Sequence, residues 1–373
     1  MKILWHSNAP FTPTGYGVET ALFVPRVASL GHEVTISAPY SFAGSPLMWG
    51  DHLVLGGAHD SYGNDVLAGH YQAHRPDLLI TLCDVFALAP SASDIVRMSA
   101  AHWMPVDCLP AGDQDIAVLR DGAGTPIAMS KFGQRVLEDE GCDPVLYVPH
   151  GVDCALFAPG EPHEGPFTIG INAANKDKSP RKGIPEQMLA FARFRERHPE
   201  ARLALHTASV SPHGVNLQAL ANRLGIADAV DFPDLYSYAT KVIGQDVMAD
   251  WYRGLDVLSN CAFGEGFGLP VLEAQASGIP VVVTDCSSMS ELHGAGWKVN
   301  GEQFWAEGHN SWWIQPYPRA VEAAYEAAWQ AREDGKMPAL RAKARSFAEQ
   351  YDADLVLSTY WKPALERLEA NLR

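Results

Sequence analysis

Basic residues, paired cysteines and long apolar runs are all scarce in this sequence. Its 28 Lys and Arg stand against 44 Asp and Glu, which gives a formal net charge of −16 at pH 7. Proteins that hold nucleic acid or an anionic membrane without sequence specificity need a basic face. The charge balance therefore argues against both partners, although it leaves room for a local basic pocket.

The cysteines, at positions 83, 108, 142, 154, 261 and 286, include no Cys-x-x-Cys pair. This spacing supports neither a zinc site nor a disulfide framework, and it favours reduced thiols in a cytoplasmic protein. No Asp-x-Asp directly follows a predicted strand, so we expect no metal and no cofactor. The longest apolar stretch, near 78–90, is broken by Asp84 and is too short to span a bilayer. Met1–His6 turns polar at Ser7, which predicts a first buried strand rather than a signal peptide.

The length and composition of the chain suit two globular domains. The chain has 373 residues, of which 47% are hydrophobic and 19% charged, and two domains of that size can each bury a core. The stretch 159–166, rich in Pro, Gly and Glu, is composed like a linker. We therefore predict a first domain at 1–160 and a second at 161–349.

The most informative stretch is Glu265–Glu273, with the sequence Glu-Gly-Phe-Gly-Leu-Pro-Val-Leu-Glu. The apolar run 257–262 before it predicts a strand, and Leu269–Ala276 predicts a helix that Gly278 closes. The run 280–284 predicts the next strand. Strand, glycine loop, helix and strand in this order form a βαβ unit.

The residues of this loop suit a nucleotide sugar. A glycine loop that opens a helix directs backbone N–H groups and the positive helix end at a ligand, and Gly266 and Gly268 have no side chain to keep that ligand away. Glu265 at the strand end and Glu273 on the first helical turn flank the same position. Carboxylates accept hydrogen bonds from hydroxyls, so a phosphate between two hydroxyl-bearing rings would satisfy every group. The alternative is an ordinary glycine turn with a Glu that offsets the helix dipole.

The full string resembles the E-x7-E signature of the retaining glycosyltransferases of family 4 and their GT-B relatives. The resemblance implies an α/β fold, GT-B, in which two doubly wound Rossmann-like domains face a central cleft. It also implies that a C-terminal helix, about 350–373, joins the N-terminal, acceptor-side domain, and that 161–349 binds the nucleotide sugar. Glu265 would contact the hydroxyls of the donor sugar and Glu273 those of the ribose. The backbone between them would contact the sugar and the β-phosphate, through Gly266, Phe267, Gly268 and Leu269.

A second string of the same family is Val148–Asp153, Val-Pro-His-Gly-Val-Asp, which relatives have where the first domain passes to the second. We expect His150 to belong to this hinge rather than to the chemistry. Near the N terminus, a loop that ends in Gly15, Tyr16 and Gly17 precedes a helix predicted at Val18–Leu30. Open α/β sheets bind ligands at the carboxyl ends of their strands. The loop is not the G-x-G-x-x-G fingerprint, so a nicotinamide enzyme is disfavoured.

The family resemblance implies that the loop of Gly15, Tyr16 and Gly17 closes over the donor phosphates; the alternative is a surface turn. The family also has a His near the end of the strand predicted at 102–107, where it touches the donor sugar. His102 and Asp107 both compete for that catalytic position, and a purely structural His102 is an equal alternative.

The loop 175–183 holds four Lys and Arg residues in an otherwise acidic chain. Runs of charge are usually solvated loops, but a departing diphosphate needs cations. In the family an Arg and a Lys-Gly pair contact the diphosphate here, and Lys182 with Gly183 matches the pair. For the Arg we favour Arg181, with Lys176 as the alternative.

The segment 296–317 departs from the family pattern, because relatives have a short glycine-proline turn there. We expect an aromatic lid on the core, made of Trp297, Phe304, Trp305, Trp312 and Trp313.

Taken together, the sequence predicts a retaining glycosyltransferase that moves a hexose-type sugar from a nucleoside diphosphate sugar, UDP- or GDP-linked. The acceptor stays open among a glycan, a lipid, a protein and a small molecule. The alternatives are a GT-B-type sugar-nucleotide epimerase or phosphorylase, and a non-catalytic sugar-nucleotide-binding protein. The presence of Glu265, Glu273 and Lys182 argues against the last of these.

Overall fold

The computed structural model describes residues 1–40, 42–161, 163–176, 180–240 and 242–372. The chain divides into two compact units. Unit 1 comprises Met1–Gly151, Ala306–Ser311 and Tyr351–Arg373, and unit 2 comprises Val152–Trp305 and Trp312–Gln350. The first boundary therefore comes earlier than the linker composition at 159–166 indicates. One reason is that the N–H of Gly151 is still held by the Glu19 carboxylate of unit 1, at 3.3 Å.

Unit 1 is built on an eight-stranded sheet in the order β3-β4-β2-β1-β5-β6-β7-β8. Its strands are β1 (Lys2–His6), β2 (Glu33–Ser37), β3 (Leu47–Trp49), β4 (His52–Leu55), β5 (Leu78–Leu82), β6 (Ala100–Met104), β7 (Thr125–Ala128) and β8 (Leu146–Tyr147). Neighbouring strands are parallel, except that β3 runs antiparallel to β4. Its helical segments are α1 (Gly15–Ser29), α2 (Leu67–His74), η1 (Val85–Ser91), α3 (Ala92–Ile95), α4 (Asp113–Arg120), α5 (Lys131–Asp139), α14 (Ala353–Val356), η4 (Leu357–Trp361) and α15 (Lys362–Leu372).

The C-terminal segment completes the core of unit 1. Strand β5 is buried along its whole length, as expected where helices cover both faces of a parallel sheet. Trp361 of η4 is fully buried, with its ring centroid 5.5 Å from Trp5 of β1 and 4.9 Å from Trp103 of β6. The predicted single helix over 350–373 is instead two helices, α14 and α15, joined by the π-helical segment η4.

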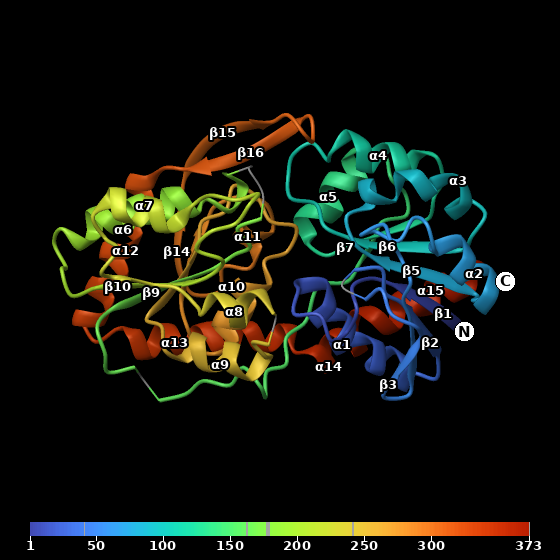
Figure 1. The fold of residues 1–373 in the computed structure, drawn as a ribbon, viewed down its shortest axis with the longest axis horizontal. Coiled ribbons are helices and arrows are strands. Elements are labelled where there is room, and N and C mark those ends of the chain that lie inside the picture. Colours follow the sequence, from blue (N-terminus) through green and yellow to red (C-terminus); the bar gives the residue numbers. More distant parts are fainter. Residues whose placement is uncertain (41, 162, 177–179, 241, 373) are drawn as a thin grey trace. The chain divides into compact units, whose positions relative to one another are not determined.

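Unit 2 contains a six-stranded parallel sheet in the order β11-β10-β9-β12-β13-β14; β9, β10 and β14 are labelled in Figure 1. Its strands are β9 (Thr168–Asn172), β10 (Arg202–His206), β11 (Val230–Asp231), β12 (Val257–Asn260), β13 (Val281–Thr284) and β14 (Gly296–Val299). Its helical segments are η2 (Pro180–Lys182), α6 (Ile184–Arg195), α7 (Leu217–Leu224), α8 (Leu235–Ala239), α9 (Gln245–Arg253), α10 (Leu269–Ala276), α11 (Ser287–Glu291), α12 (Pro318–Glu333) and α13 (Met337–Ala348); η3 (Glu349–Tyr351) follows.

Helices cover both faces of this second sheet. One face packs with α6, α7 and α12 into a core that includes Ile169, Phe191 and Tyr325. The side chains of Leu258 and Val281 lie outside that core and are also fully buried. Since successive strand residues point to opposite faces, the other face is covered too, and α10 packs there with α9 and α13.

The strand order of each sheet reverses at one point, which is where open α/β sheets bind ligands. In unit 1, β1 lies between β2 and β5, and in unit 2, β9 lies between β10 and β12. The loop that leaves β9 carries Lys182, and the loop that leaves β12 carries Glu265. The two loops therefore leave adjacent parallel strands at the same edge of the sheet.

Helix boundaries correct two of the sequence predictions. Helix α1 begins at Gly15, not Val18, because Thr14 caps it and accepts a hydrogen bond from the Gly17 N–H at 3.2 Å. The two glycines and Tyr16 thus form the first helical turn. Helix α10 spans Leu269–Ala276 as predicted, but this start places Glu273 in its second turn.

The aromatic segment 296–317 forms β14 and a hairpin of β15 (Gly301–Ala306) and β16 (Ser311–Pro316). Strand alternation places Trp313 inward, 5% exposed, whereas Trp305 and Trp312 are 44% and 40% exposed. The expected aromatic lid is therefore wrong for these two outward-facing tryptophans. In the described part of the chain, every helix is too short or too polar to cross a membrane.

Candidate functional site

In unit 2 the structure brings Glu265 into contact with Lys182 and Arg181. Lys182 Nζ donates to both carboxylate oxygens of Glu265, at 2.7 and 2.9 Å. Arg181 Nη1 lies 3.3 Å from Glu265 Oε2 and donates to the carbonyl of Gly264 at 2.7 Å. The side chain of Glu265 is only 11% exposed and those of both cations 23%. The cluster is therefore a half-buried ion pair network rather than a solvated loop.

The two cations keep Glu265 ionised. Burial alone would raise the pKa of its carboxyl, but the ammonium of Lys182 and the guanidinium of Arg181 outweigh that effect and hold the pKa below its ordinary value. An ionised carboxylate only accepts hydrogen bonds. At neutral pH Glu265 is thus an acceptor suited to donor hydroxyls.

Close backbone packing sets the position of Lys182. Gly183, the next residue, has φ +59°, and a Cβ there would lie 2.2 Å from the carbonyl oxygen of Cys261. Only glycine allows both this left-handed conformation and this approach. Phe263 N–H also donates to the Arg181 carbonyl at 2.6 Å. The loop after β9 is thus packed directly on the loop after β12.

Two serines hold the loop from Glu265 to Phe267. Ser287 Oγ accepts from the Glu265 N–H at 3.0 Å, and Ser288 Oγ bonds the carbonyls of Glu265 and Phe267 at 2.7 and 2.6 Å. Ser287 has φ +48°, a left-handed conformation that non-glycine residues seldom adopt. Such conformations cluster at functional sites, and here it turns the hydroxyl toward Glu265.

The start of α10 presents groups suited to an anion. Gly268 has φ +104° and precedes the first helical residue, Leu269. The side-chain amide of Asn260 lies 3.8 Å from the place of a Cβ on Gly268. Asn260 is 4% exposed, and among the described residues its Nδ2 has no hydrogen-bond partner. A buried donor that lacks a partner calls for a ligand or water, and this one lies beside Gly268 at the helix N terminus.

Glu273 is held by a separate network. Tyr252 donates to Glu273 Oε2 at 2.7 Å and accepts from Asn172 Nδ2 at 2.8 Å. Burial, followed by the nearby Glu273 carboxylate, raises the pKa of Tyr252 well above its ordinary value, so the phenol stays a donor. Glu273 is 8% exposed, and Asn172 ends β9, so this carboxylate also lies at the carboxyl edge of the sheet.

Lys176 differs from Lys182 and Arg181 in its surroundings. Its side chain is exposed, and its neighbour Asn175 is the anchored residue, which donates to the carbonyls of Ala208 and Val215 at 3.0 and 2.7 Å. Arg181, in contrast, contacts Glu265. The geometry therefore favours Arg181 over Lys176 as the partner of Lys182, while the rest of the loop, 177–179, lies outside the described residues.

In unit 1 the turn of Gly15, Tyr16 and Gly17 is a tightly packed helix start. A Cβ on Gly17 would lie 2.1 Å from the carbonyl oxygen of Thr12, so the close backbone approach requires glycine. Thr14, the cap, is itself held by Asn8 Nδ2 at 2.7 Å. The residues thus sit at the amino end of α1, just after the carboxyl end of β1.

His102 has the geometry of a structural residue. It is fully buried in β6, and Thr81 Oγ1 lies 2.8 Å from its Nδ1 while its Nε2 bonds the carbonyl of Ala123. Burial lowers its pKa despite the bond to Ala123. Since both nitrogens are engaged, the structural alternative is the one that the geometry supports.

Asp107 is half-buried just after β6, in a group of carboxylates at the carboxyl edge of unit 1. The pKa of Asp115 is raised to about 7, first by burial and then by the charges of Asp84 and Asp107, although the Phe86 N–H stabilises its anion. The edge is therefore acidic.

His150 is also buried, and its Nδ1 lies 2.8 Å from Glu19 Oε2. The bond ties the end of unit 1 to α1.

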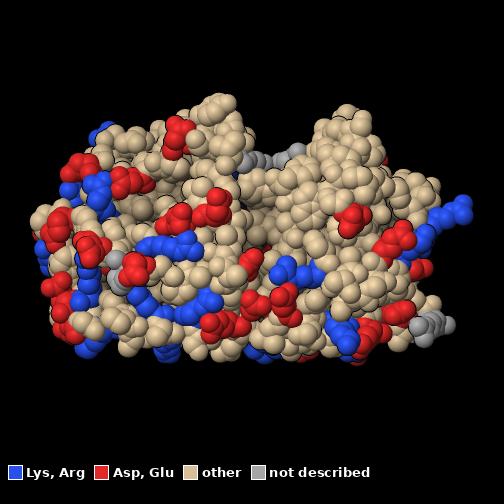
Figure 2. All heavy atoms as spheres, turned by 90° about the horizontal axis from the view of Figure 1, so that it is seen from below, with Lys and Arg blue, Asp and Glu red and all other residues tan. Residues whose placement is uncertain are grey.

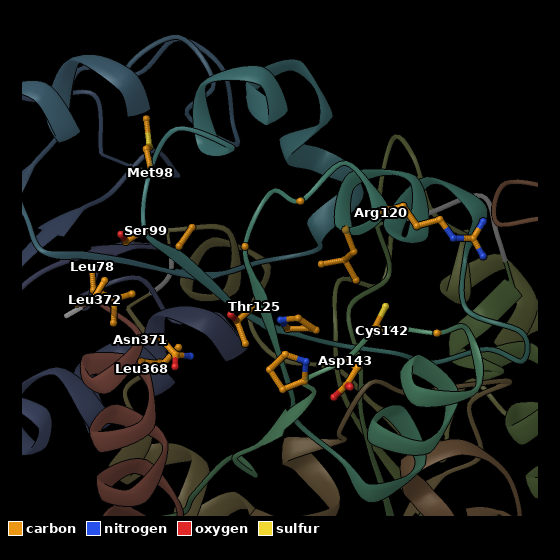
Figure 3. Close-up of a pocket in the computed structure, with 17 residues that line it drawn as sticks. Leu78, Met98, Ser99, Arg120, Thr125, Cys142, Asp143, Leu368, Asn371 and Leu372 are labelled. Carbon is orange, nitrogen blue, oxygen red and sulfur yellow. The ribbon is translucent and has the colours of Figure 1, made fainter.

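A hollow of about 600 Å³ lies at the opposite edge of the unit 1 sheet. Leu78, Ala100 and Thr125, the first residues of β5, β6 and β7, line it together with the end of α15 (Figure 3). Ligands of open α/β sheets bind at the carboxyl ends of the strands. The hollow lies at the amino ends, so it is not where such a ligand is expected.

On the face drawn in Figure 2, Lys and Arg are scattered among Asp and Glu.

Three residues that hold the site have no signal in the sequence. Gln187 is a polar residue on the buried face of α6, Ser288 follows no known pattern, and Tyr252 looks like an ordinary core aromatic. Each was missed because its role depends on contacts with residues distant in the chain.

Comparison with known proteins is consistent with this geometry. Residues 170–311 match the model of a family described as Glycosyl transferases group 1. A D-inositol 3-phosphate glycosyltransferase of Catenulispora acidiphila is 37% identical over 157 residues, which cover 38% of this chain and 35% of that protein. The match thus spans about a third of the relative's length.

Solved structures of other proteins are similar in fold over nearly the whole chain. Sucrose-phosphate synthase of Thermosynechococcus elongatus has a TM-score of 0.77 at 13% identity and covers 100% of both chains. HepE of Anabaena, in complex with UDP and glucose, has a TM-score of 0.67 at 18% identity over 99% of this chain and 100% of that one. The fold is therefore GT-B, as the signature predicted.

Proposed function

We propose that this protein is a retaining glycosyltransferase of the family 4 type, which moves a hexose-type sugar from a nucleoside diphosphate sugar to a hydroxyl of its acceptor. The observation that carries the proposal is the contact of Lys182 and Arg181 with Glu265, beside the glycine loop that opens α10. One carboxylate, which accepts hydrogen bonds from sugar hydroxyls, and two cations for a diphosphate lie within one cluster. The match of residues 170–311 to a glycosyltransferase family supports it.

The donor would be held from both of its ends. Glu265 accepts hydrogen bonds from the hydroxyls of the sugar, and Glu273 accepts them from the ribose. Between them, the backbone of Gly266 to Leu269, the amino end of α10 and the side-chain amide of Asn260 face the phosphates. In unit 1, the amino end of α1 at Gly15 offers a second such helix start.

The cations act on the bond that breaks. When the bond from the anomeric carbon to the diphosphate oxygen breaks, its electron pair stays on the diphosphate. Lys182 and Arg181 stabilise that developing charge, which is larger in the transition state than in the bound donor. With two cations in place, we propose that the reaction needs no metal ion.

The donor that we propose is a UDP-linked hexose, with a GDP-linked hexose as the other candidate. HepE of Anabaena, which shares the fold, was solved in complex with UDP and glucose, and this supports the UDP-linked donor. The cysteine spacing supports a cytoplasmic enzyme.

A thermal-shift screen against UDP-, GDP-, ADP- and TDP-sugars tests the proposal, because a ligand that binds the native state raises the apparent stability. We expect one nucleotide sugar to stabilise the protein, and Lys182→Ala to reduce that shift by a smaller factor than it reduces turnover. Proton NMR of the anomeric centre in the product then reports retention. Stabilisation by none of the four nucleotide sugars would contradict the proposal. Product formation without any acceptor would favour an epimerase.

A further inference from the structure

We infer that Gln187 is a positioning residue of this site: its side-chain amide fastens the Lys182–Gly183 turn to the end of β12 and so fixes where the Lys182 ammonium stands relative to Glu265. The role in catalysis rests on the proposed function. The structural part of the inference does not, because it concerns only contacts within unit 2.

The amide of Gln187 uses its full hydrogen-bonding capacity. Its Nε2 donates to the carbonyl oxygens of Lys182 and Gly183 at 3.0 and 3.1 Å. Its Oε1 accepts from Ser259 Oγ at 2.7 Å and from the Cys261 N–H at 3.2 Å. Two donors and two acceptor lone pairs are all that a Gln side chain has.

These four bonds join two loops that are distant in the chain. Lys182 and Gly183 belong to the turn after β9, while Ser259 and Cys261 belong to the end of β12 and the residue after it. The ion pair between Lys182 and Glu265 joins the same two loops at their tips. Gln187 therefore acts as a brace behind that pair.

An apolar residue could not replace the brace. Gln187 is fully buried, so removing its amide would leave the carbonyl of Lys182 and the N–H of Cys261 without this partner in a site shielded from water. Each such loss costs the desolvation of a buried polar group. The turn would relieve the cost by moving, and Lys182 would move with it.

The network continues away from the site, which argues for rigidity. Tyr325 of α12 is fully buried and donates to Ser259 Oγ at 2.8 Å. Ser259 can then direct its own hydrogen to Gln187. Helix α12 thus orients the serine, the serine orients the amide, and the amide holds the turn.

Gln275 provides a matched control for the alternative that Gln187 serves stability alone. It too is fully buried in unit 2, and its Nε2 donates to the carbonyls of Val271 and Leu292 at 3.0 and 2.8 Å. Its Oε1 accepts from the N–H groups of Gly294 and Ala295 at 2.9 and 3.1 Å. The chemistry is the same, but these bonds contact neither the Lys182 turn nor Glu265.

The experiment compares Gln187→Met with Gln275→Met in the full chain. Both variants lose four buried hydrogen bonds, so both should unfold at lower denaturant concentration. Only Gln187→Met should raise the pKa of Glu265, measured by carboxyl carbon NMR with Glu265→Gln to assign the signal, because Lys182 holds that pKa down. Only Gln187→Met should also weaken UDP binding and lower turnover, each by on the order of tenfold.

The outcomes separate this inference from the proposed function. Equal effects of the two variants on the Glu265 signal, or none from Gln187→Met, would overturn the positioning role. If the Glu265 signal shifts as expected while UDP and the other nucleotides fail to bind the unaltered protein, the brace stands and the proposed function fails.

Discussion

Lys182 Nζ contacts both carboxylate oxygens of Glu265, at 2.7 and 2.9 Å, across a sequence separation of 83 residues. The contact fixes the two charged groups relative to each other. Charged groups that are already oriented need little reorganisation when charge develops in a reaction. The ion pair keeps Glu265 ionised, and under the proposed function it also keeps a cation where the diphosphate would depart.

Removing either cation should lower turnover by a larger factor than it lowers donor affinity. Lys182→Ala and Arg181→Ala should each lower turnover by at least about tenfold, because their interaction with the diphosphate is strongest in the transition state. Lys176→Ala, at the exposed position, should stay near the activity of the unaltered protein. Steady-state kinetics of the three variants decide between the alternatives. A crippled Lys176→Ala beside a normal Arg181→Ala would show that the partner of Lys182 was assigned wrongly.

The same pair predicts an effect on stability that can be separated from activity. Lys182→Met leaves the half-buried Glu265 carboxylate with Arg181 alone, and losing one partner of such a pair is destabilising. The double variant Lys182→Met with Glu265→Gln should regain much of the lost stability and none of the activity. Urea denaturation of the single and double variants measures the first effect. No recovery in the double variant would mean that the pair contributes little to folding.

Transfer should proceed in excess EDTA. The roles that a metal could take at the diphosphate are assigned to Lys182, Arg181 and the helix start at Leu269, so chelation should leave the rate unchanged. The measurement is a rate with and without EDTA after dialysis against chelator. Activity that is lost with EDTA and restored by manganese or magnesium would contradict the assignment.

Asp115 should make the protein less stable as the pH rises. Burial raises its folded pKa to about 7, above the ordinary value of 3.8. The folded protein therefore keeps a proton that the unfolded chain releases, and stability falls as the pH rises from about 4 to 7. Asp115→Asn keeps an acceptor for the Phe86 N–H and removes the titration. We expect it to be more stable than the unaltered protein by about 1–3 kcal/mol at pH 8, with the gain vanishing near pH 4. Urea denaturation at both pH values tests it, and an equal gain at both would contradict it.

Local patterns predicted the fold well because they depend on neighbours in the chain. The helix predicted at Leu269–Ala276 is α10 as observed, and the strand predicted at 257–262 is β12, which ends at Asn260. The helix start at Gly15 was missed because its cap, Thr14, lies among turn-forming residues. The pairing of Lys182 with Glu265 was not predicted, since it depends on β9 and β12 being adjacent in the sheet. Gln187 could not be found for the same reason.

The structure gives the two glutamates of the signature different neighbours, and this predicts different phenotypes. Glu265 contacts Lys182 and Arg181, whereas Glu273 accepts from Tyr252. Glu265→Gln should chiefly lower turnover, because a carboxylate beside the reacting sugar orients the anomeric carbon and stabilises its developing positive charge. Glu273→Gln should chiefly weaken nucleotide affinity, since the ribose is remote from the reacting bond and an amide accepts only part of the hydrogen bonding.

Free nucleoside diphosphate supplies the control for this last prediction, because it contains the ribose and lacks the sugar. Its affinity, measured by calorimetry, should fall with Glu273→Gln by about 1.5–3 kcal/mol, the scale of a hydrogen bond to a charged group. With Glu265→Gln it should hardly change. Tyr252→Phe removes the hydroxyl that donates to Glu273. Like Glu273→Gln, it should lower the affinity, and it leaves the contacts of Glu265 unchanged. Equal losses from the two glutamate variants would show that sugar and ribose are not divided between them as proposed.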